Sequence, residues 1–139
     1  MSRTFEPPPG RRVFSRSFIP TAADIDANGH VNNVVYLGWA QDLAIAHWDS
    51  AAEPAESDAM AWVALRHEVD YRRALLPGET ALGRTWVSDK AEGPRFDRFV
   101  RIDGPDGAMC AQVRTVWCLI ERATGRPRRV PAELVARFG

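Results

Sequence analysis

The spacing of apolar residues changes along this chain, and one segment has the period of a helix. From Asn33 onward, apolar side chains recur at steps of three and four residues, which places them on one helical face. Further apolar residues lie between them, as is typical of a buried helix. The pattern predicts one long helix over residues 33–50, followed by a loop over residues 50–58, where small, acidic and proline residues mix.

Most of the remaining chain has the two-residue period of a strand, and residues 61–73 have the alternation of a half-buried strand. Strand segments are predicted over residues 11–20, 61–73, 80–90, 95–103 and 108–122, and a short helix over residues 130–138. Short connections join the last four strands, and no helix alternates with them, so they predict an antiparallel sheet. The predicted fold class is α+β: a five-stranded antiparallel sheet wrapped around one long central helix.

Length and charge favour one small domain and exclude some partners. The chain has 139 residues, which suits one domain with one core. Residues 1–10 contain three consecutive prolines and predict an extended arm, and residues 11–139 predict a single domain. Lys plus Arg and Asp plus Glu both number 18, so no basic field draws the chain to nucleic acid or to an anionic membrane.

Sequence features also bear on location and on metals. The start of the chain lacks the pattern of a signal peptide, and no apolar run reaches the roughly 18 residues that a membrane span needs. We therefore expect a cytoplasmic protein. No spacing of Cys or His residues suggests a metal site.

The segment DIDANGHVNN, residues 24–33, concentrates polar chemistry directly before the long helix. Asp and Asn at such places are common helix caps, and Gly29 can supply a left-handed turn. The polar groups together exceed what one helix end requires. Unpaired backbone amides at a helix start lie at the positive end of its dipole, so the amides near Asn32 and Asn33 can stabilise a negatively charged oxygen. Asp26 lies a few residues upstream, within reach of the same space.

This segment continues as VVYLGW, and residues 24–39 as a whole resemble the active-site segment of hotdog-fold thioesterases of the 4-hydroxybenzoyl-CoA thioesterase type. From Asp26 to Trp39 the chain is also similar to the pattern Asp-x-Asn-x-His-Val-Asn-Asn-x-x-Tyr-x-Gly-Trp of plant acyl-ACP thioesterases. The order of elements over residues 12–138 resembles that family too. The resemblance implies a hotdog fold and hydrolysis of an acyl-CoA, or an acyl-ACP, to acid and thiol, without a metal or redox cofactor.

The resemblance also implies roles for single residues. Asp26 would be the catalytic carboxylate, as the nucleophile or as the base for water, and the amide of Asn33 would polarise the thioester carbonyl. Asn28 would orient these groups, and His30 would assist as a base or a hydrogen-bond partner. The candidate substrate-binding residues are Asn32, Tyr36, Trp39, Arg72 and Arg73.

One position departs from the plant enzymes, which have a glutamate after the paired arginines of the second strand. This chain has Ala74 there, and Glu68 or Asp70 could compensate, although neither occupies the matching place. His47 and His67 lie in apolar patterns that favour buried, hydrogen-bonded histidines. Several arginines are candidates for the phosphates of coenzyme A or of an acyl carrier, or for a solvated surface: Arg72, Arg73, Arg95, Arg98, Arg128 and Arg129.

Two further expectations concern partners and alternatives. A single sheet leaves edges that natural proteins cover or pair, so we expect a homodimer, or a tetramer, whose active site is completed across the interface and whose long final strand is available for pairing. Two other functions remain open at this point. One is a non-catalytic domain that binds acyl-CoA or acyl-ACP, and the other is a hotdog hydratase that acts on enoyl thioesters.

Overall fold

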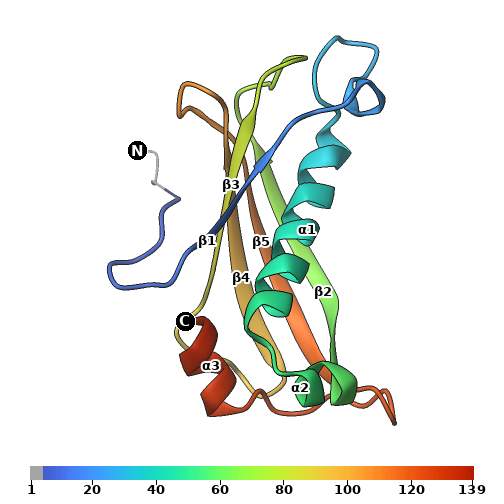
Figure 1. Cartoon of the computed structure of the whole chain (residues 1–139), viewed down its shortest axis with the longest axis vertical. Coiled ribbons are helices and arrows are strands. Elements are labelled where there is room, and N and C mark those ends of the chain that lie inside the picture. Colours follow the sequence, from blue (N-terminus) through green and yellow to red (C-terminus); the bar gives the residue numbers. More distant parts are fainter. Residues whose placement is uncertain (1–4) are drawn as a thin grey trace.

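The computed structural model describes residues 5–139, which form one curved antiparallel sheet with a long helix on its inner side (Figure 1). The elements are β1 (Phe14–Phe18), α1 (Asn33–Ala51), α2 (Pro54–Ala59), β2 (Met60–Tyr71), β3 (Ala81–Val87), β4 (Arg95–Asp103), β5 (Met109–Glu121) and α3 (Ala132–Phe138), with a 3-10 turn over Ala22–Asp24. The strands lie in the order β1-β3-β4-β5-β2. All neighbouring strands are antiparallel, which confirms the predicted five-stranded sheet with one long helix.

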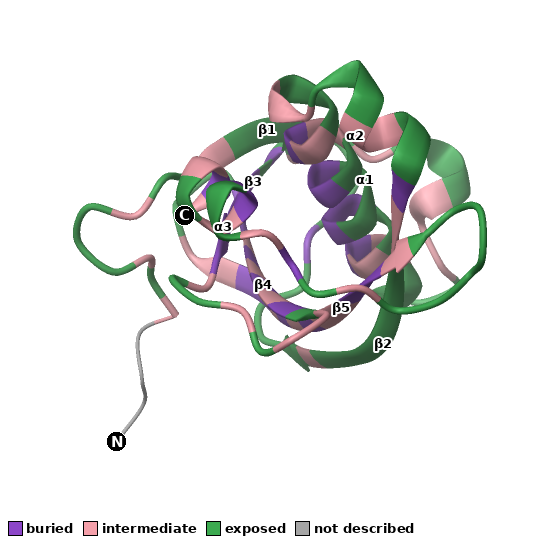
Figure 2. Cartoon of the chain, turned by 90° about the horizontal axis from the view of Figure 1, so that it is seen from below, coloured by how far each residue is buried: buried purple, intermediate pink, exposed green. Residues whose placement is uncertain are grey.

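Helix α1 packs on the sheet through one face. Its buried residues are Tyr36, Trp39, Ala40, Leu43, Ala44 and His47. Gly83 of β3 permits this close packing, because a Cβ atom there would lie 2.6 Å from Cδ1 of Leu43. The opposite face carries exposed apolar side chains, with Val34 72% and Ile45 51% accessible. The sheet therefore curves around one side of α1 (Figure 2), and the expectation that α1 is buried nearly all round is wrong for this chain.

The predicted loop after α1 contains a short helix instead. Pro54 occupies the first turn of α2, where proline fits without the loss of a hydrogen bond. The Glu53 amide donates to Oε1 of Glu56 at 2.8 Å, and Arg137 of α3 binds the same carboxylate. The composition of this segment indicated a loop, but proline and glutamate at these positions satisfy the start of a helix.

The two edges of the sheet are β1 and β2, so the expectation that the long final strand is free to pair is wrong. β5 is the longest strand, but β4 and β2 occupy both of its sides. β2 is almost as long, and it is mostly exposed, whereas the sequence predicted a half-buried strand. Helix α1 lies mainly over β1 and β3, so it covers little of β2, which it meets through the ring pairs Tyr36–Tyr71 and Trp48–Trp62.

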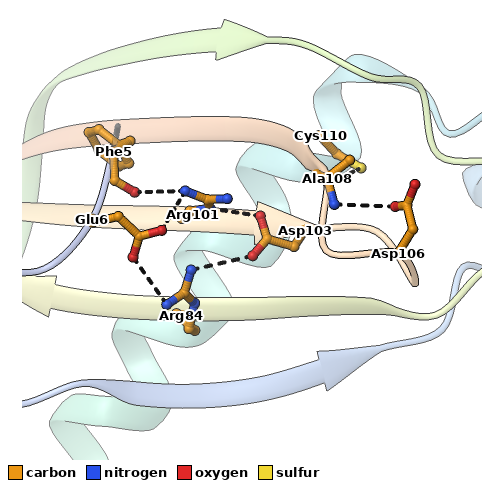
Figure 3. Close-up of polar contacts among 8 residues, drawn as sticks. All are labelled: Phe5, Glu6, Arg84, Arg101, Asp103, Asp106, Ala108 and Cys110. Carbon is orange, nitrogen blue, oxygen red and sulfur yellow. Dashed lines mark hydrogen bonds and ion pairs between the residues drawn. The ribbon is translucent and has the colours of Figure 1, made fainter. Parts of the chain in front are cut away.

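The described part of the N-terminal arm, residues 5–10, returns to the sheet. The ring of Phe5 lies 5.5 Å from that of Trp86, on the sheet face opposite α1. Glu6 accepts from Arg101 at 2.7 Å and from Arg84 at 3.4 Å, and Asp103 binds both of these arginines (Figure 3). Residues 1–4 of the predicted arm lie outside the described residues. An ionic network thus joins the arm to β3 and β4.

The buried face of α1 includes one polar group, His47, as predicted. Its ring stacks on Phe14 with centroids 5.2 Å apart, and its Nδ1 accepts from Nη1 of Arg98 at 3.0 Å. Burial, and then the nearby charge of Arg98, lower the pKa of His47 to about 4, so the ring is neutral at pH 7. His67 differs from the prediction, because it is exposed on β2 and meets Oγ1 of Thr115 at 2.8 Å.

Neutral His47 makes folding stability depend on pH. Its pKa is lower in the folded chain than the ordinary 6.5, so the unfolded chain takes up a proton first as the pH falls. The contribution of neutral His47 to the free energy of unfolding is fully present above about pH 6.5. Between pH 6.5 and pH 4 the free energy of unfolding falls by roughly 3 kcal/mol, because the unfolded chain binds the proton more tightly. Urea unfolding of the wild type and of His47→Gln at both pH values checks this. Carboxylates contribute equally to both proteins, so an equal loss of stability in the two would contradict the prediction.

Candidate active site

Residues 24–32 fold back on themselves directly before α1. Ile25 and Val31 form an isolated antiparallel bridge, and the Asp26 amide donates to the carbonyl of His30 at 3.0 Å. Gly29 has φ +84°, a conformation that glycine adopts without strain, and its amide closes the turn on the carbonyl of Asp26 at 3.0 Å. The turn therefore places Asp26 and His30 on adjacent arms of one small loop.

The Asp26 carboxylate has a local partner and remains accessible. Its Oδ1 accepts from the Asn28 amide at 2.9 Å and lies 4.0 Å from Nδ1 of His30. The side chains of Asp26 and His30 are 25% and 40% exposed. The side chain of Asn28 is exposed and has no hydrogen-bond partner within residues 5–139. The carboxylate thus supports the turn and keeps an oxygen that can bind a proton.

The start of α1 offers a backbone donor. Asn32 caps the helix, since its Oδ1 accepts from the Val34 amide at 3.1 Å. The Asn33 amide has no acceptor within the described part of the chain, and it lies at the positive end of the helix dipole. The Asn33 carbonyl accepts from the hydroxyl of Tyr71 at 3.1 Å, which links the helix start to β2. An oxyanion is the kind of group that such a free amide stabilises.

Leu75 fixes this helix start to the chain that follows β2. Its carbonyl accepts from the Val31 amide at 2.9 Å, and its own amide donates to the Tyr36 hydroxyl at 3.1 Å. Burial raises the pKa of Tyr36, so this hydroxyl stays protonated at neutral pH. Trp39 stacks on Phe18 with centroids 5.1 Å apart. Both aromatic residues therefore belong to the core beside the loop, and their role in substrate binding stays a prediction.

Comparison with known proteins identifies the family. A family model described as the thioesterase-like superfamily matches residues 20–138. The chain belongs to the thioesterase-like superfamily. No curated protein matches it in sequence.

Solved structures similar to this superfamily member share its hotdog fold. A thioesterase from Thermus thermophilus, complexed with coenzyme A and Zn, is 24% identical, with a TM-score of 0.79 over 93% of this chain and 98% of that one. A 1,4-dihydroxy-2-naphthoyl-CoA thioesterase from Synechocystis is 15% identical, with a TM-score of 0.78 over 91% and 96%. An acyl-ACP thioesterase from Bacteroides thetaiotaomicron is 21% identical, with a TM-score of 0.80 over 91% and 53%.

The candidate arginines of this thioesterase-like chain do not form one cluster. Arg72 and Arg73 follow β2, at the same end of the molecule as residues 24–32 (Figure 1). Arg72 is exposed and makes no ion pair within residues 5–139, whereas Arg73 binds Asp106 and also lies 3.9 Å from Glu79. The strand register places Arg95 at the opposite end of the sheet, where Arg128 also lies beside β5, and Arg129 follows Arg128 in the chain. Arg98 is buried, not solvated.

The suggested substitutes for the missing glutamate do not serve that purpose. Glu68 binds Arg114, and Asp70 accepts from Gln112 at 2.9 Å. Both pairs lie on the outer face of the sheet, because strand residues alternate and Val69 packs against the core on the inner face. The side chains of Glu68 and Asp70 therefore point away from α1, and neither replaces the glutamate at Ala74.

The surroundings of the site were compared with the cavities, the possible metal ligands and the helices of the described residues. Asp26, Asn28, His30 and Asn33 do not line the three best-formed cavities within residues 5–139. The side chains of Asp26 and His30 lie at the surface of the single chain, 25% and 40% exposed. Among the described residues, no three His, Cys, Asp or Glu side chains lie close enough together to hold a metal ion. No described helix is both long enough and apolar enough to cross a membrane.

Sequence reasoning missed Tyr71 and Leu75, which fix the start of α1. Tyr71 binds the carbonyl of Asn33, and the amide of Leu75 binds the hydroxyl of Tyr36. More than 35 residues separate the partners in both pairs, and each bond includes one backbone atom. No local motif marks such contacts. The alternating pattern of residues 61–73 predicted that Tyr71 lies on a strand, but it did not indicate that Tyr71 contacts Asn33.

Two substitutions of Asp26 distinguish the effect of its negative charge on stability from the effect of its hydrogen bond to the Asn28 amide. In Asp26→Asn the amide oxygen still accepts from the Asn28 amide, so we expect stability close to that of the wild type. In Asp26→Ala the bond is lost, and the free energy of unfolding should fall by about 1 kcal/mol. Urea unfolding at neutral pH measures both. Equal destabilisation by the two substitutions would show that the carboxylate charge, not the acceptor, supports the turn.

Proposed function

We propose that this chain hydrolyses acyl-CoA thioesters to a free acid and coenzyme A. The observation that carries the proposal is the loop over residues 24–33, which joins an accessible carboxylate to a free helix-start amide by short backbone bonds. A thioester hydrolase needs these two elements, a base or nucleophile and a donor for the developing oxyanion. Membership of the thioesterase-like superfamily over residues 20–138 supports the same reaction.

In the proposed reaction, Asp26 takes a proton from water, and the water oxygen attacks the thioester carbonyl carbon. The carbonyl oxygen becomes an oxyanion that the Asn33 amide stabilises. The C–S bond breaks when this oxyanion collapses, and the leaving thiolate takes up the proton. His30, whose Nδ1 lies 4.0 Å from the carboxylate, assists as a base or as a hydrogen-bond partner of the water, and Asn28 orients these groups. Direct attack by Asp26, followed by hydrolysis of the resulting anhydride, uses the same groups.

Coenzyme A is the proposed carrier. Arg72 is exposed and makes no ion pair within residues 5–139 at the same end as the loop, so its guanidinium can meet a phosphate of the carrier. The similar structure from Thermus thermophilus holds coenzyme A, which supports this choice. An acyl carrier protein carries the same phosphopantetheine arm, and the similar acyl-ACP thioesterase from Bacteroides thetaiotaomicron keeps it as the second candidate.

A non-catalytic acyl-thioester binding domain is the competing function. It is favoured by Ala74, which stands where the plant enzymes carry a glutamate and which neither Glu68 nor Asp70 replaces. An enoyl-thioester hydratase is a third candidate, and the spacing of Asp26 and His30 favours the thioesterase over it. Product analysis separates the three functions, because only hydrolysis releases a free thiol.

The proposed active unit is a homodimer joined through β2. This long edge strand is uncovered, and Val63, Leu65 and Tyr71 on it are 44%, 51% and 41% exposed. Pairing of β2 with the same strand of a second copy would satisfy the free backbone groups and cover these side chains. A two-fold axis perpendicular to the sheet reverses the strand direction. It therefore brings the start of α1 in one copy near the end of α1 in the other, and the open loop gains a second wall.

Thiol release tests the reaction and the role of Asp26 together. Wild-type protein should release thiol from at least one member of a panel of short, long and aromatic acyl-CoAs. Asp26→Asn should lower kcat by roughly 100-fold or more, because it keeps the turn but removes the base. Asp24→Asn is the matched control: it lies on the same loop, and its side-chain oxygen accepts from the Thr21 amide, away from Asp26, so kcat should stay near the wild-type value.

The outcomes of this assay separate the proposals. No thiol release from any acyl-CoA or acyl-ACP would exclude the hydrolase and leave the binding domain. Full activity in Asp26→Asn would exclude only the role of Asp26.

Sedimentation velocity tests the dimer. The wild type should sediment as a dimer, and Val63→Lys should raise the dissociation constant by at least about tenfold, because each 1.4 kcal/mol lost corresponds to a factor of ten. Ile19→Lys is the control, since Ile19 is 72% exposed but lies beyond β1, on the other edge. A monomeric wild type, or equal effects of the two lysines, would rule out pairing through β2.

A further inference from the structure

A cavity of about 440 Å³ lies beside the C-terminal half of α1, far from Asp26. Its walls include Ala44, Ile45, Trp48, Trp62, Phe96 and Trp117. The rise of a helix puts Trp48 roughly 20 Å from the start of α1, so this cavity and the Asp26 loop are separate within one chain. The volume lies within the range of about 300 to 1,000 Å³ that is usual for sites of small organic ligands.

Arg98 of β4 lines this cavity and has only neutral partners. Its side chain belongs to the buried residues, with 9% of the residue exposed. Nη1 donates to Nδ1 of His47 and to Oγ1 of Thr85, both at 3.0 Å. No carboxylate within residues 5–139 lies within ion-pair distance of it. A buried cation normally has an anionic partner, because removal of a charge from water costs several kcal/mol. The charge of Arg98 is therefore left uncompensated by this part of the chain.

The other titratable side chains around the cavity do not neutralise the positive charge of Arg98. His47 is neutral, since burial lowers its pKa to about 4 and its Nδ1 accepts a hydrogen bond. Asp49 is exposed on α1, and it does not pair with Arg98. Arg122 is occupied by the carbonyls of Ser57 and Met60 at 2.8 and 3.1 Å. Burial lowers the pKa of Arg98 to about 10, which keeps the guanidinium charged at neutral pH.

The free edge of the guanidinium has the geometry that a carboxylate needs. Both hydrogens of Nη1 are used, whereas Nε and Nη2 have no acceptor within residues 5–139. Neither atom belongs to the sealed, unpaired side-chain nitrogens of residues 5–139, whereas the indole nitrogen of Trp117 does, and Arg98 lines the cavity. Nε and Nη2 form the fork that binds the two oxygens of a carboxylate side by side. The ring of Trp117 belongs to the same wall, while its sealed indole N–H has no acceptor in the described part of the chain.

We propose that this cavity is a binding site for a small acid with an aromatic or apolar body, whose carboxylate pairs with Arg98. The carboxylate would neutralise the buried guanidinium, and the body would lie among the rings of Trp48, Trp62 and Trp117. A bare inorganic anion satisfies the guanidinium only, and a neutral ligand satisfies the rings only. Within one chain the site requires no contribution from Asp26, so binding of the acid can be measured whether or not the chain hydrolyses thioesters.

Isothermal titration calorimetry with 2-naphthoate and its neutral analogue 2-naphthamide tests the proposal on the wild-type protein. We expect 2-naphthoate to bind at least about tenfold more tightly, because the guanidinium distinguishes charge while the rings do not. Arg98→Met should remove this preference by weakening the binding of 2-naphthoate alone. Arg122→Met is the matched control, since it removes the other cation of the same cavity and should leave the preference in place.

A second measurement keeps the test decisive if Arg98→Met does not fold. In the wild type, the NMR signal of the Trp117 indole N–H should shift with 2-naphthoate at concentrations where 2-naphthamide has no effect. Equal binding of the two ligands, or an unchanged Trp117 signal under saturating 2-naphthoate, would overturn the proposal. Loss of the preference in Arg122→Met but not in Arg98→Met would overturn it as well.

Discussion

The two backbone hydrogen bonds of Leu75 are the constraint on which the candidate active site depends. They join the end of β2 to the start of α1, through the Val31 amide on one side and the Tyr36 hydroxyl on the other. They act together with the bond from Tyr71 to the Asn33 carbonyl and with the buried side chain of Val31 to fix the loop that carries Asp26. Because Leu75 is itself buried in the core, the position of the loop follows from the packing of the whole sheet. A partly exposed site thus has a rigid support.

Helix α1 carries different chemistry at its two ends. Its start has a free amide next to an accessible carboxylate, which suits the activation of a carbonyl group. Its last turns form the wall of an aromatic cavity with a buried cation, which suits a ligand that brings its own negative charge. The sheet curves around the helix and closes one side of it, while the other side and β2 remain open. The proposed dimer would bring opposite ends of two such helices together.

Much of the fold could be predicted from the sequence because it depends on local patterns. The three- and four-residue spacing after Asn33 located α1 within a residue of its end, and the two-residue alternation located all five strands. The predictions that failed concern neighbours. The segment 54–59 is a helix whose start suits Pro54 and the Glu53–Glu56 bond and whose Glu56 also binds Arg137, and β2 proved exposed because α1 lies mainly over the other edge of the sheet. Arg98 looked like any other strand arginine, since alternation alone does not tell which face is covered.

The sequence by itself determined the family, the order of the elements and the residues of the Asp26 loop, because each of these is written in contiguous residues. Asp26, Asn28, Gly29 and His30 interact almost entirely with one another, so their arrangement follows from a short segment. Only the tertiary structure decided that Leu75 supports this loop, that β2 is the long free edge, and that Arg98 is buried beside a cavity without a carboxylate partner within residues 5–139. These properties arise from contacts between segments distant in sequence. The free energy of a buried polar or charged group depends on the atoms that surround it in space rather than on its neighbours in the chain.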